Sequence, residues 1–582
     1  MVGPLYDLIA NPLGAIRLTF EKAVAAGSDP GTFTGKDWGV CDLFREFLFE
    51  DGNISQVPVL NSTNIQWIKP NTLVKFRGMV QDMLGNEFYI GIQKDEGGWR
   101  TNKFTDSTQF PVSSSETPPW ERHLLYCIPV PGLNPWAEVC SNSHKQCTNL
   151  TSPQREKRQR EDNADFEAMD VQVLELNDDD FPTTKKMRED GPLSSHPEGS
   201  SPSSKIDSER NSLPCLVKVY DSAECDLKLN DVFEFVGVLT FDSEPPVEEG
   251  NNDELMGIFC DDASGHLPPS KVPRLHCLAH RKLAVQDFLT FSVAEEPKPQ
   301  LVKEIRAALL DHLTAILGND GVAAHFMLLH LLSMVHSRVD SLAVGKFSLN
   351  LTSFSKESAS VFCNHLNFTL RNLLPYTQSM SLTVDYLNTV SLTPKKDYEI
   401  NRLRVGDLQL AEGTHMTIDE TKLEPGMLNP SGVDNARLLK NLMEFQNVEY
   451  DFEFYKMEMK ADVQLLIISE GKSNILPADT VLPFRPTCLS SYKNIDGENI
   501  NLWRWYLTSL RSLPYSIDSA MQKTLEDELV AARQADRTIG SLEFSRWLTM
   551  GRLMSISYGE TSLSHEHWQM VKELESLRRE RL

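Results

Sequence analysis

This sequence has few of the features that mark membrane, secreted or nucleic-acid-binding proteins. No apolar run of membrane-spanning length is free of charges, so we expect no membrane partner. The first residues lack the basic and apolar regions of a secretory signal. The 10 cysteines are scattered over 582 residues, which fits reduced thiols better than a disulfide framework. Lys and Arg number 57 against 82 Asp and Glu, a net charge of -25, so strong direct DNA binding is not expected.

Glycine is also missing from the place where a nucleotide-binding core requires it. Residues 347–351 predict a strand, and a Ser-rich loop and a helix to about residue 374 follow. In an ATPase core, glycines in such a loop let backbone N–H groups surround the phosphates, and a Lys neutralises the phosphate oxygens. The loop here, residues 352–358, reads TSFSKES and contains no Gly. The pattern therefore predicts the layout of an ATPase core without its phosphate cradle.

An acidic pair, Asp419 and Glu420, ends a second predicted core strand, and a third covers residues 463–468. A carboxylate pair at a strand end can hold Mg²⁺ and a water in an active ATPase. Because the phosphate cradle is absent, the pair is better interpreted as a retained structural feature. We expect no catalytic residue, no cofactor and no enzyme activity.

One group of residues has the chemistry of a zinc site. Its members are Cys127, Cys140, His144 and Cys147. Structural zinc sites usually present their ligands as well-spaced pairs, and this spacing matches no common zinc pattern. We therefore expect no metal site.

Alternating apolar and polar residues predict short strands in two stretches of the chain. Residues 73–80 and 88–90, separated by a turn signal at 84–86, predict a β hairpin, and residues 228–239 repeat the pattern. Short strands with a central Gly suit a small closed barrel of the OB type. Such barrels often bind single strands in a basic groove. Because the strand flanks here are acidic, a structural or protein-binding barrel is the favoured interpretation.

A polar insert separates the two halves of the predicted barrel. Residues 141–212 consist mainly of Ser, Pro, Asp, Glu, Lys and Arg, a composition that cannot offset the entropy of ordering, so we expect disorder. Basic clusters in such a segment are typical of nuclear-import signals. The alternative interpretation is a run of charged residues that is exposed to solvent and has no import function. The candidate import residues are Arg155, Lys157, Arg158, Arg160, Lys185, Lys186 and Arg188.

Helical spacing of apolar residues predicts helices before residue 50, in residues 301–338 and from about residue 502 onward. The predicted fold class is multidomain, α/β plus β, with an OB-like barrel region, a degenerate AAA+-like core and a helical lid. The predicted regions are an N-terminal helical segment (1–50), the two parts of the barrel (51–140 and 213–292), the insert (141–212), a helical segment (297–344), the core (345–485) and the C-terminal helical lid (486–582).

Several short phrases, spread over most of the chain outside the insert, carry a family resemblance. They include Thr417-Ile418-Asp419-Glu420-Thr421, Tyr450-Asp451-Phe452, Ile468-Ser469-Glu470-Gly471, Lys346-Phe347-Ser348-Leu349-Asn350 and Leu476-Pro477-Ala478-Asp479. With these phrases the sequence resembles the mini-chromosome maintenance (MCM) complex-binding protein family, and its plant members most. The family is itself similar to the subunits of the replicative MCM helicase.

The resemblance implies a non-catalytic partner of MCM helicase subunits that acts in DNA replication. It implies a role in assembling or unloading the MCM complex, contact with chromatin through that complex, an effect on sister-chromatid cohesion and a nuclear location. Where a helicase subunit has Asn at the end of the strand after its hairpin, this chain has Ser469-Glu470. Two alternatives are an active AAA+ ATPase and an OB-type protein that binds single-stranded DNA.

Overall fold

The computed structural model describes most of the chain outside the insert. The described residues are 7–29, 33, 37–50, 52–95, 98–106, 119–139, 213–220, 226–241, 272–289, 298–488, 497–535, 537 and 540–582. The chain divides into two units, residues 1–144 with 212–582 and residues 145–211. The second unit lies outside the described residues, so all that follows concerns the first.

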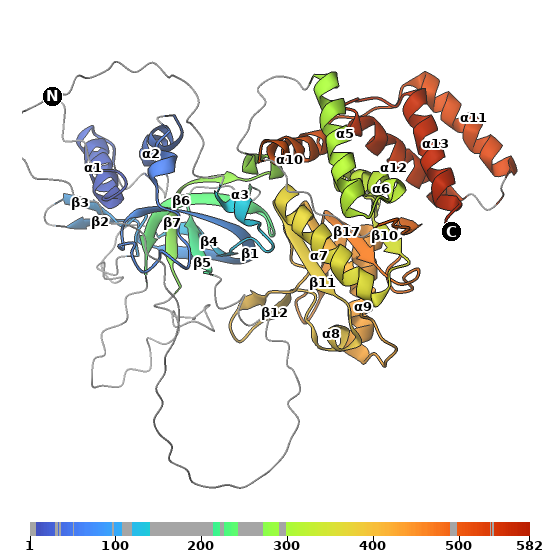
Figure 1. Ribbon diagram of the computed structural model, residues 1–582. Coiled ribbons are helices and arrows are strands. Elements are labelled where there is room, and N and C mark those ends of the chain that lie inside the picture. The colour runs from blue at the N-terminus through green and yellow to red at the C-terminus, as the bar shows by residue number, and fades with distance from the viewer. Residues whose placement is uncertain are drawn as a thin grey trace, which may run out of the picture. The chain divides into compact units, whose positions relative to one another are not determined.

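A closed five-stranded barrel forms the first part of the described chain (Figure 1). Its strands, in spatial order, are β1 (Leu73–Tyr89), β4 (Trp120–Ile128), β5 (Cys215–Val219), β7 (Arg274–Lys282) and β6 (Val232–Thr240). All neighbours pair antiparallel except β5 and β7, which are parallel. Strands β4 and β5 pair directly although residues 141–212 lie between them. Two strands that pair with each other therefore flank the insert in the sequence.

Short elements surround the barrel. They are α1 (Pro12–Ala25), α2 (Val40–Arg45), α3 (Pro135–Val139), the two-stranded sheet of β2 (Ile92–Asp95) and β3 (Gly98–Thr101), and the single turns Glu46–Glu50, Asn53–Gln56 and Val285–Phe288. Helix α1 begins with Pro12, which needs no hydrogen bond to its nitrogen at the first helical position, and the Asn11 side chain caps it. Ile16 of α1 and Phe44 of α2 pack against side chains of the barrel strands that point out of the barrel.

The predicted hairpin in residues 73–91 is wrong. β1 is one strand of 17 residues that pairs with β4 as far as Tyr89. The turn signal is instead a β-bulge, because the register with β4 shifts between Met83 and Gly85 and Gly85 has a φ of 88°. A glycine at positive φ lets one strand carry an extra residue and bend without ending.

A five-stranded parallel sheet forms the second part. Its strands, in spatial order, are β11 (Thr377–Ser381), β14 (Thr414–Asp419), β17 (Val463–Ile468), β10 (Leu349–Thr352) and β18 (Thr480–Pro483). All adjacent strands pair parallel. The central strand β17 is buried along its whole length, as expected for a strand covered on both faces. The strand predicted at 463–468 is confirmed residue for residue.

Alternate residues of β17 enter two different hydrophobic clusters. Leu465 and Ile467 pack on one face of the sheet with α8 (Val384–Thr389) and α9 (Pro430–Phe445). Leu466 and Ile468 pack on the other face with a second group of helices. The helices of that second face are α5 (Pro299–Ile316), α6 (Gly321–Leu332), α7 (Lys356–Leu373), α10 (Gly497–Arg511), α11 (Ser519–Ala535), α12 (Ser541–Ser557) and α13 (His565–Arg579). Figure 1 shows α7 lying over the sheet.

Two small sheets extend the core. The first, in the order β13-β12-β15-β16, joins β12 (Lys395–Asp397) and β13 (Arg402–Arg404) to the hairpin of β15 (Asn447–Asp451) and β16 (Lys456–Lys460). The second is the hairpin of β8 (Ser337–Val339) and β9 (Leu342–Val344). The helical segment predicted for 297–344 is therefore shorter: helix α6 ends at Leu332, where Ser333 is extended, and the β8–β9 hairpin follows.

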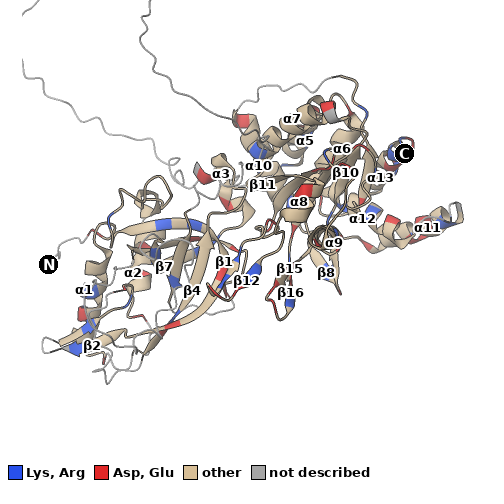
Figure 2. Ribbon diagram, turned by 90° about the horizontal axis from the view of Figure 1, so that it is seen from below, with Lys and Arg blue, Asp and Glu red and all other residues tan. Residues whose placement is uncertain are grey.

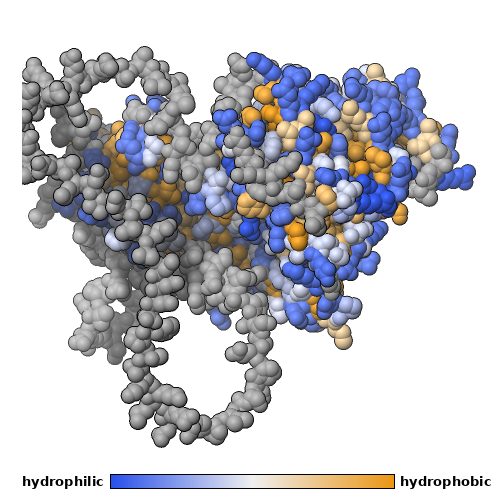
Figure 3. All heavy atoms as spheres, in the orientation of Figure 1, coloured by the Kyte–Doolittle hydropathy of each residue, from blue (hydrophilic) through white to orange (hydrophobic). Residues whose placement is uncertain are grey.

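The described surface is mixed in character. Hydrophobic residues on the face shown in Figure 3 lie in small groups among hydrophilic ones. Lys and Arg are interspersed with Asp and Glu along the ribbon in Figure 2. Within the described ranges, no helix has the length and apolar character needed to span a bilayer.

Candidate functional site

The acidic pair lies where three core strands end together. Glu420 follows β14, and its backbone N–H donates to Ile468 O at the end of β17, 2.8 Å away. Carboxyl ends of parallel strands form the edge where α/β proteins bind ligands. Asp419 accepts hydrogen bonds from Thr421 N (3.1 Å) and Thr421 Oγ1 (2.6 Å). The neighbouring turn therefore already holds the Asp419 carboxylate.

Glu420 points back into the protein. Ser473 Oγ donates to Glu420 Oε1 at 2.8 Å, and in the described chain the buried Oε2 has no hydrogen-bond partner. Burial raises the pKa of Glu420, and the hydrogen bond from Ser473 only partly offsets that effect. Burial thus disfavours the ionised form of the carboxyl, which is the form that would bind a cation.

A phenylalanine fills the loop that replaces the phosphate cradle. Phe354 is 3% exposed and stacks on Phe484, with ring centroids 4.5 Å apart and planes 13° apart. Phe362 of α7 lies edge-on to the same two rings, at 6.1 Å from Phe354 and 5.0 Å from Phe484. The side chain therefore anchors the loop to the hydrophobic core.

The backbone donors of this loop are also engaged. Ser353 N donates to Glu470 O (3.0 Å) and Phe354 N to Ser469 O (3.3 Å). At the start of α7 the Ser355 hydroxyl accepts from Ser358 N, and the Ser358 hydroxyl accepts from Ser355 N. Helix N-terminal N–H groups bind phosphate in a working cradle, whereas this helix caps itself. Serine hydroxyls of the chain itself thus accept the hydrogen bonds that a bound anion would accept in a working cradle.

A polar network that the sequence did not predict joins β10 to β17. Asn350 Nδ2 donates to Ser469 Oγ at 2.7 Å, and Asn350 Oδ1 accepts from Ser473 N at 3.4 Å. Through Ser473 the network reaches Glu420. An amide between two leucines of a buried strand is the sequence signal that could have pointed to it, because buried polar groups need partners.

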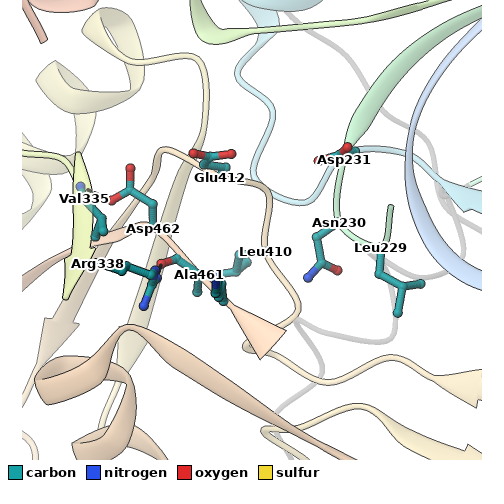
Figure 4. Close-up of a pocket in the computed structure, with 10 residues that line it drawn as sticks. Leu229, Asn230, Asp231, Val335, Arg338, Leu410, Glu412, Ala461 and Asp462 are labelled. Carbon is teal, nitrogen blue, oxygen red and sulfur yellow. Dashed lines mark hydrogen bonds between the residues drawn. The ribbon is translucent and has the colours of Figure 1, made fainter. Parts of the chain in front are cut away.

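A pocket of about 260 Å³ lies at the opposite edge of the sheet (Figure 4). It is lined by Leu229, Asn230, Asp231, Val335, Arg338, Leu410, Glu412, Lys460, Ala461 and Asp462. Residues 410–412 and 460–462 precede β14 and β17, so the pocket lies at the amino ends of the strands. Asp231 pairs with Lys282 (2.7 Å), and Asp462 accepts from Val335 N (3.1 Å). The pocket is therefore separate from the acidic pair, and these two carboxylates already have partners.

The basic residues of the barrel are engaged with carboxylates. Arg77 and Arg281 both pair with Glu234, at 3.2 and 3.4 Å. Arg122 and Lys218 both pair with Asp106, at 2.9 and 2.7 Å. Phosphate binding requires basic side chains that can neutralise the backbone. These four side chains are already paired with carboxylates of the protein, which favours a structural or protein-binding barrel.

The remaining predicted site residues fall into two groups. Cys127 is buried in the barrel beside Cys215, and burial raises the pKa of the Cys127 thiol well above its usual value. The other three zinc candidates and all seven candidate import residues lie outside the described residues. In the part of the chain that the structure covers, no group of three or more His, Cys, Asp or Glu could hold a metal ion.

The sequence was compared with family models and with known proteins. A model described as mini-chromosome maintenance replisome factor matches residues 44–582. The chain belongs to this family. The match spans the barrel, the insert, the core and the C-terminal helices, so the family resemblance of the sequence is confirmed.

Several relatives carry the printed name mini-chromosome maintenance complex-binding protein. The one from Arabidopsis thaliana is 55% identical over 589 residues and covers 100% of both chains. The one from Gallus gallus is 35% identical over 631 residues, covering 99% of this chain and 98% of its own. The one from Homo sapiens is 33% identical over 645 residues, with the same coverage. The greater identity to the plant relative fits the predicted likeness to plant family members.

Proposed function

We propose that this protein is a nuclear, non-catalytic partner of the MCM complex that controls its assembly on, or unloading from, chromatin. In this role it acts in DNA replication and influences sister-chromatid cohesion, and it contacts chromatin through the MCM complex. The observation that carries the proposal is the full-length similarity to relatives named as MCM complex-binding proteins. The similarity covers 98–100% of the length of these three relatives.

The order of the core strands supports a degenerate AAA+-like core. The strand before the loop, β10, and the strand that ends in the acidic pair, β14, lie on either side of β17. AAA+ cores likewise place one strand between the phosphate-loop strand and the acidic strand. The five-stranded barrel with a central Gly in β6 supports the OB-like interpretation of the first part. Fold alone does not assign function, so the site must decide between activity and binding.

The chemistry of the loop supports a role without ATP hydrolysis. Phosphoryl transfer needs a cradle for the phosphates and a held Mg²⁺. Phe354 fills the loop, Ser355 caps α7, and the carboxyl of Glu420 is turned inward toward Ser473. These features also weigh against the active ATPase that the acidic pair alone would suggest.

Affinity capture on the full chain tests the proposal. Immobilised protein incubated with nuclear extract is expected to retain MCM subunits, identified by mass spectrometry, equally well with ATP, with ADP and without nucleotide. The matched variant combines Asp419→Asn with Glu420→Gln and is expected to retain the same subunits. Recovery of no MCM subunit would refute the proposed partner. ATP hydrolysis that this variant abolishes would instead establish the ATPase alternative.

We also propose that the two basic clusters of the insert direct nuclear import. The test replaces the seven candidate residues by Ala in a fluorescent fusion of the full chain and measures its nuclear-to-cytoplasmic ratio. The ratio is expected to fall severalfold, because import receptors recognise such clusters through their positive charge. A fusion with seven acidic residues of the same insert replaced by Ala is the control. An unchanged ratio in the basic variant would mean that import depends on another segment.

A further inference from the structure

The β15–β16 hairpin ends in aromatic side chains that the fold leaves in water. Phe454 is 82% exposed, and Tyr455 and Tyr398 of the β12–β13 connection are also exposed. Exposed aromatic groups gathered at one point are typical of binding surfaces, because their burial against a partner supplies much of the affinity. We name Tyr398, Phe454 and Tyr455 the aromatic tip.

The aromatic tip is held rigid by contacts at its own end of the hairpin. Phe452 and Tyr455 stack with ring centroids 5.0 Å apart and planes 9° apart. Tyr398 Oη donates to Phe452 O at 2.9 Å, and the Tyr398 and Phe454 rings are 5.5 Å apart. Glu453 sits at a φ of 64°, which closes the turn. A preformed tip loses little entropy on binding.

Arg338 of β8 fixes the base of the hairpin. Its guanidinium donates to Phe445 O (3.0 Å), Gln446 O (3.0 Å) and Ala461 O (2.7 Å). The last two residues flank β15 and β16, so both strands are tied to the core where they emerge. In Figure 2 the hairpin projects from the core beside β8. The fold therefore presents the aromatic tip on a stiff arm.

Charge at the hairpin sheet indicates the kind of partner. Residues 395–404 and 447–460 contain six Lys or Arg and six Asp or Glu, so the sheet has no positive excess for binding a nucleic acid backbone. Glu399 and Glu453, which adjoin Tyr398 and Phe454 in the sequence, are exposed. The complementary surface is an apolar pocket with basic groups at its rim. A protein that holds DNA must carry basic groups of this kind on its own surface.

We propose that the aromatic tip is the anchor by which this chain docks on a subunit of the MCM complex. The assignment rests on the proposed function, which names the partner. It goes further by locating the contact on the hairpin at the amino edge of the sheet, away from the acidic pair. The aromatic rings enter an apolar pocket of the subunit, and Glu399 and Glu453 face its basic rim.

The test measures the affinity of full-length variants for purified MCM complex by biolayer interferometry. Combining Phe454→Ser with Tyr455→Ser is expected to weaken binding at least tenfold, because central aromatic anchors dominate interface energies. Combining Glu399→Lys with Glu453→Lys is expected to slow association, with an effect that shrinks at high salt. Trp67→Ser is the matched control, since Trp67 is an aromatic residue 82% exposed elsewhere, and it is expected to bind within twofold of wild type.

The outcomes separate this inference from the proposed function. Wild-type binding with unchanged affinity in the aromatic double variant overturns the docking site and leaves the proposed function intact. Failure of the wild-type chain to bind refutes both. If the double variant loses only self-association, or only binding to a single-stranded oligonucleotide, the tip serves a second copy or a nucleic acid and the inference is wrong. Circular dichroism spectra that match the wild type establish that the exposed substitutions leave the fold intact.

Discussion

Replacing Asp106 by Asn is expected to lower the free energy of unfolding by about 3–5 kcal/mol, because the change removes the carboxylate from a buried ionic network. Asp106 Oδ1 accepts hydrogen bonds from Lys218 Nζ (2.7 Å) and Arg122 Nη2 (2.9 Å), and Oδ2 accepts from His276 Nε2 (3.1 Å). The side chains of Lys218 and Arg122 are only 3% and 5% exposed. Without Asp106, two buried cations share Glu87 alone.

The protonation state of the network follows from its hydrogen bonds. Burial by itself would raise the pKa of Asp106, but the hydrogen bond from His276 and the nearby positive charges of Lys218 and Arg122 outweigh it. The pKa of Asp106 is therefore held well below its usual range. Burial lowers the pKa of His276 to about 4, so the ring is neutral, its Nε2–H donates to Asp106 and its Nδ1 accepts from Tyr220 Oη at 2.7 Å.

Thermal unfolding of the full chain measures the effect of Asp106→Asn. A loss of 1 kcal/mol lowers the melting temperature by about 2–4 °C in a domain of 150–250 residues, so a drop of roughly 6–20 °C is expected. The control is Asp42→Asn, which breaks a pair with Arg45 whose side chains are 81% and 64% exposed. A pair this exposed contributes less than about 1 kcal/mol. Equal shifts in the two variants would show that the network is not a special source of stability.

Most core elements could be predicted from the sequence because their signals are local. The strand at 463–468 is continuously apolar, and a strand covered on both faces requires that pattern. Helix α9 has Asn429 as its cap, Pro430 at its first position and Gln446 in the left-handed conformation at its end. These signals lie within or next to the element that they define, so the sequence around it suffices.

The errors occurred where a distant part of the chain decides the local structure. Gly85 has the sequence signature of a turn, but β4 pairs on both sides of it and converts the turn into a bulge. The sequence predicts a helical segment over residues 297–344, but residues 337–344 form the β8–β9 hairpin. Arg338 in that hairpin donates to residues more than one hundred positions away. No local pattern contains such contacts.

In the candidate site, too, the local features could be predicted from the sequence and the long-range contacts could not. The missing glycines and the acidic pair are visible in the sequence, and they predict an ATPase layout without its cradle. The packing of Phe354 is not visible in the sequence, because its stacking partner Phe484 lies 130 positions further on. Places where a local rule is broken are often functional. The exposure of Phe454 beside Tyr398 and Tyr455 is likewise visible only in the structure.

Lowering the pH from 7 to 4.5 is expected to cost stability through a pair of buried histidines in the core. His330 of α6 donates through Nδ1 to Phe347 O at 2.7 Å, so its Nε2 accepts from His415 Nε2–H of β14 at 3.1 Å. Burial lowers the pKa of His330 to about 4, and it lowers the pKa of His415 well below the usual value. A second proton on His330 would place two N–H groups against each other, and one on His415 would bury an Nδ1–H that has no hydrogen-bond partner among the described residues.

The direction follows from proton binding. In the unfolded chain histidine has a pKa of about 6.5, so below that pH the unfolded state binds protons that the folded state refuses. Stability contributed by neutral His330 is complete above pH 6.5 and is lost as the pH falls toward 4. The pKa difference of 2.5 units, at about 1.4 kcal/mol per unit, amounts to roughly 3 kcal/mol for His330 alone. His415 adds a loss in the same direction.

A glutamine at position 330 isolates this effect, because its amide can still donate to Phe347 O and accept from His415. His330→Gln is expected to flatten the dependence of the melting temperature on pH between 6.5 and 4.5, whereas His565→Gln, which removes an exposed histidine and leaves both buried rings, keeps the wild-type slope. Glu420 and Asp462 act in the opposite direction, since burial raises their pKa values and the folded state gains protons on them first. Both carboxyls are present in every variant, so their contribution to the pH dependence cancels in the comparison.

A pH dependence of the melting temperature that His330→Gln leaves unchanged would assign the acid sensitivity to groups other than this histidine pair.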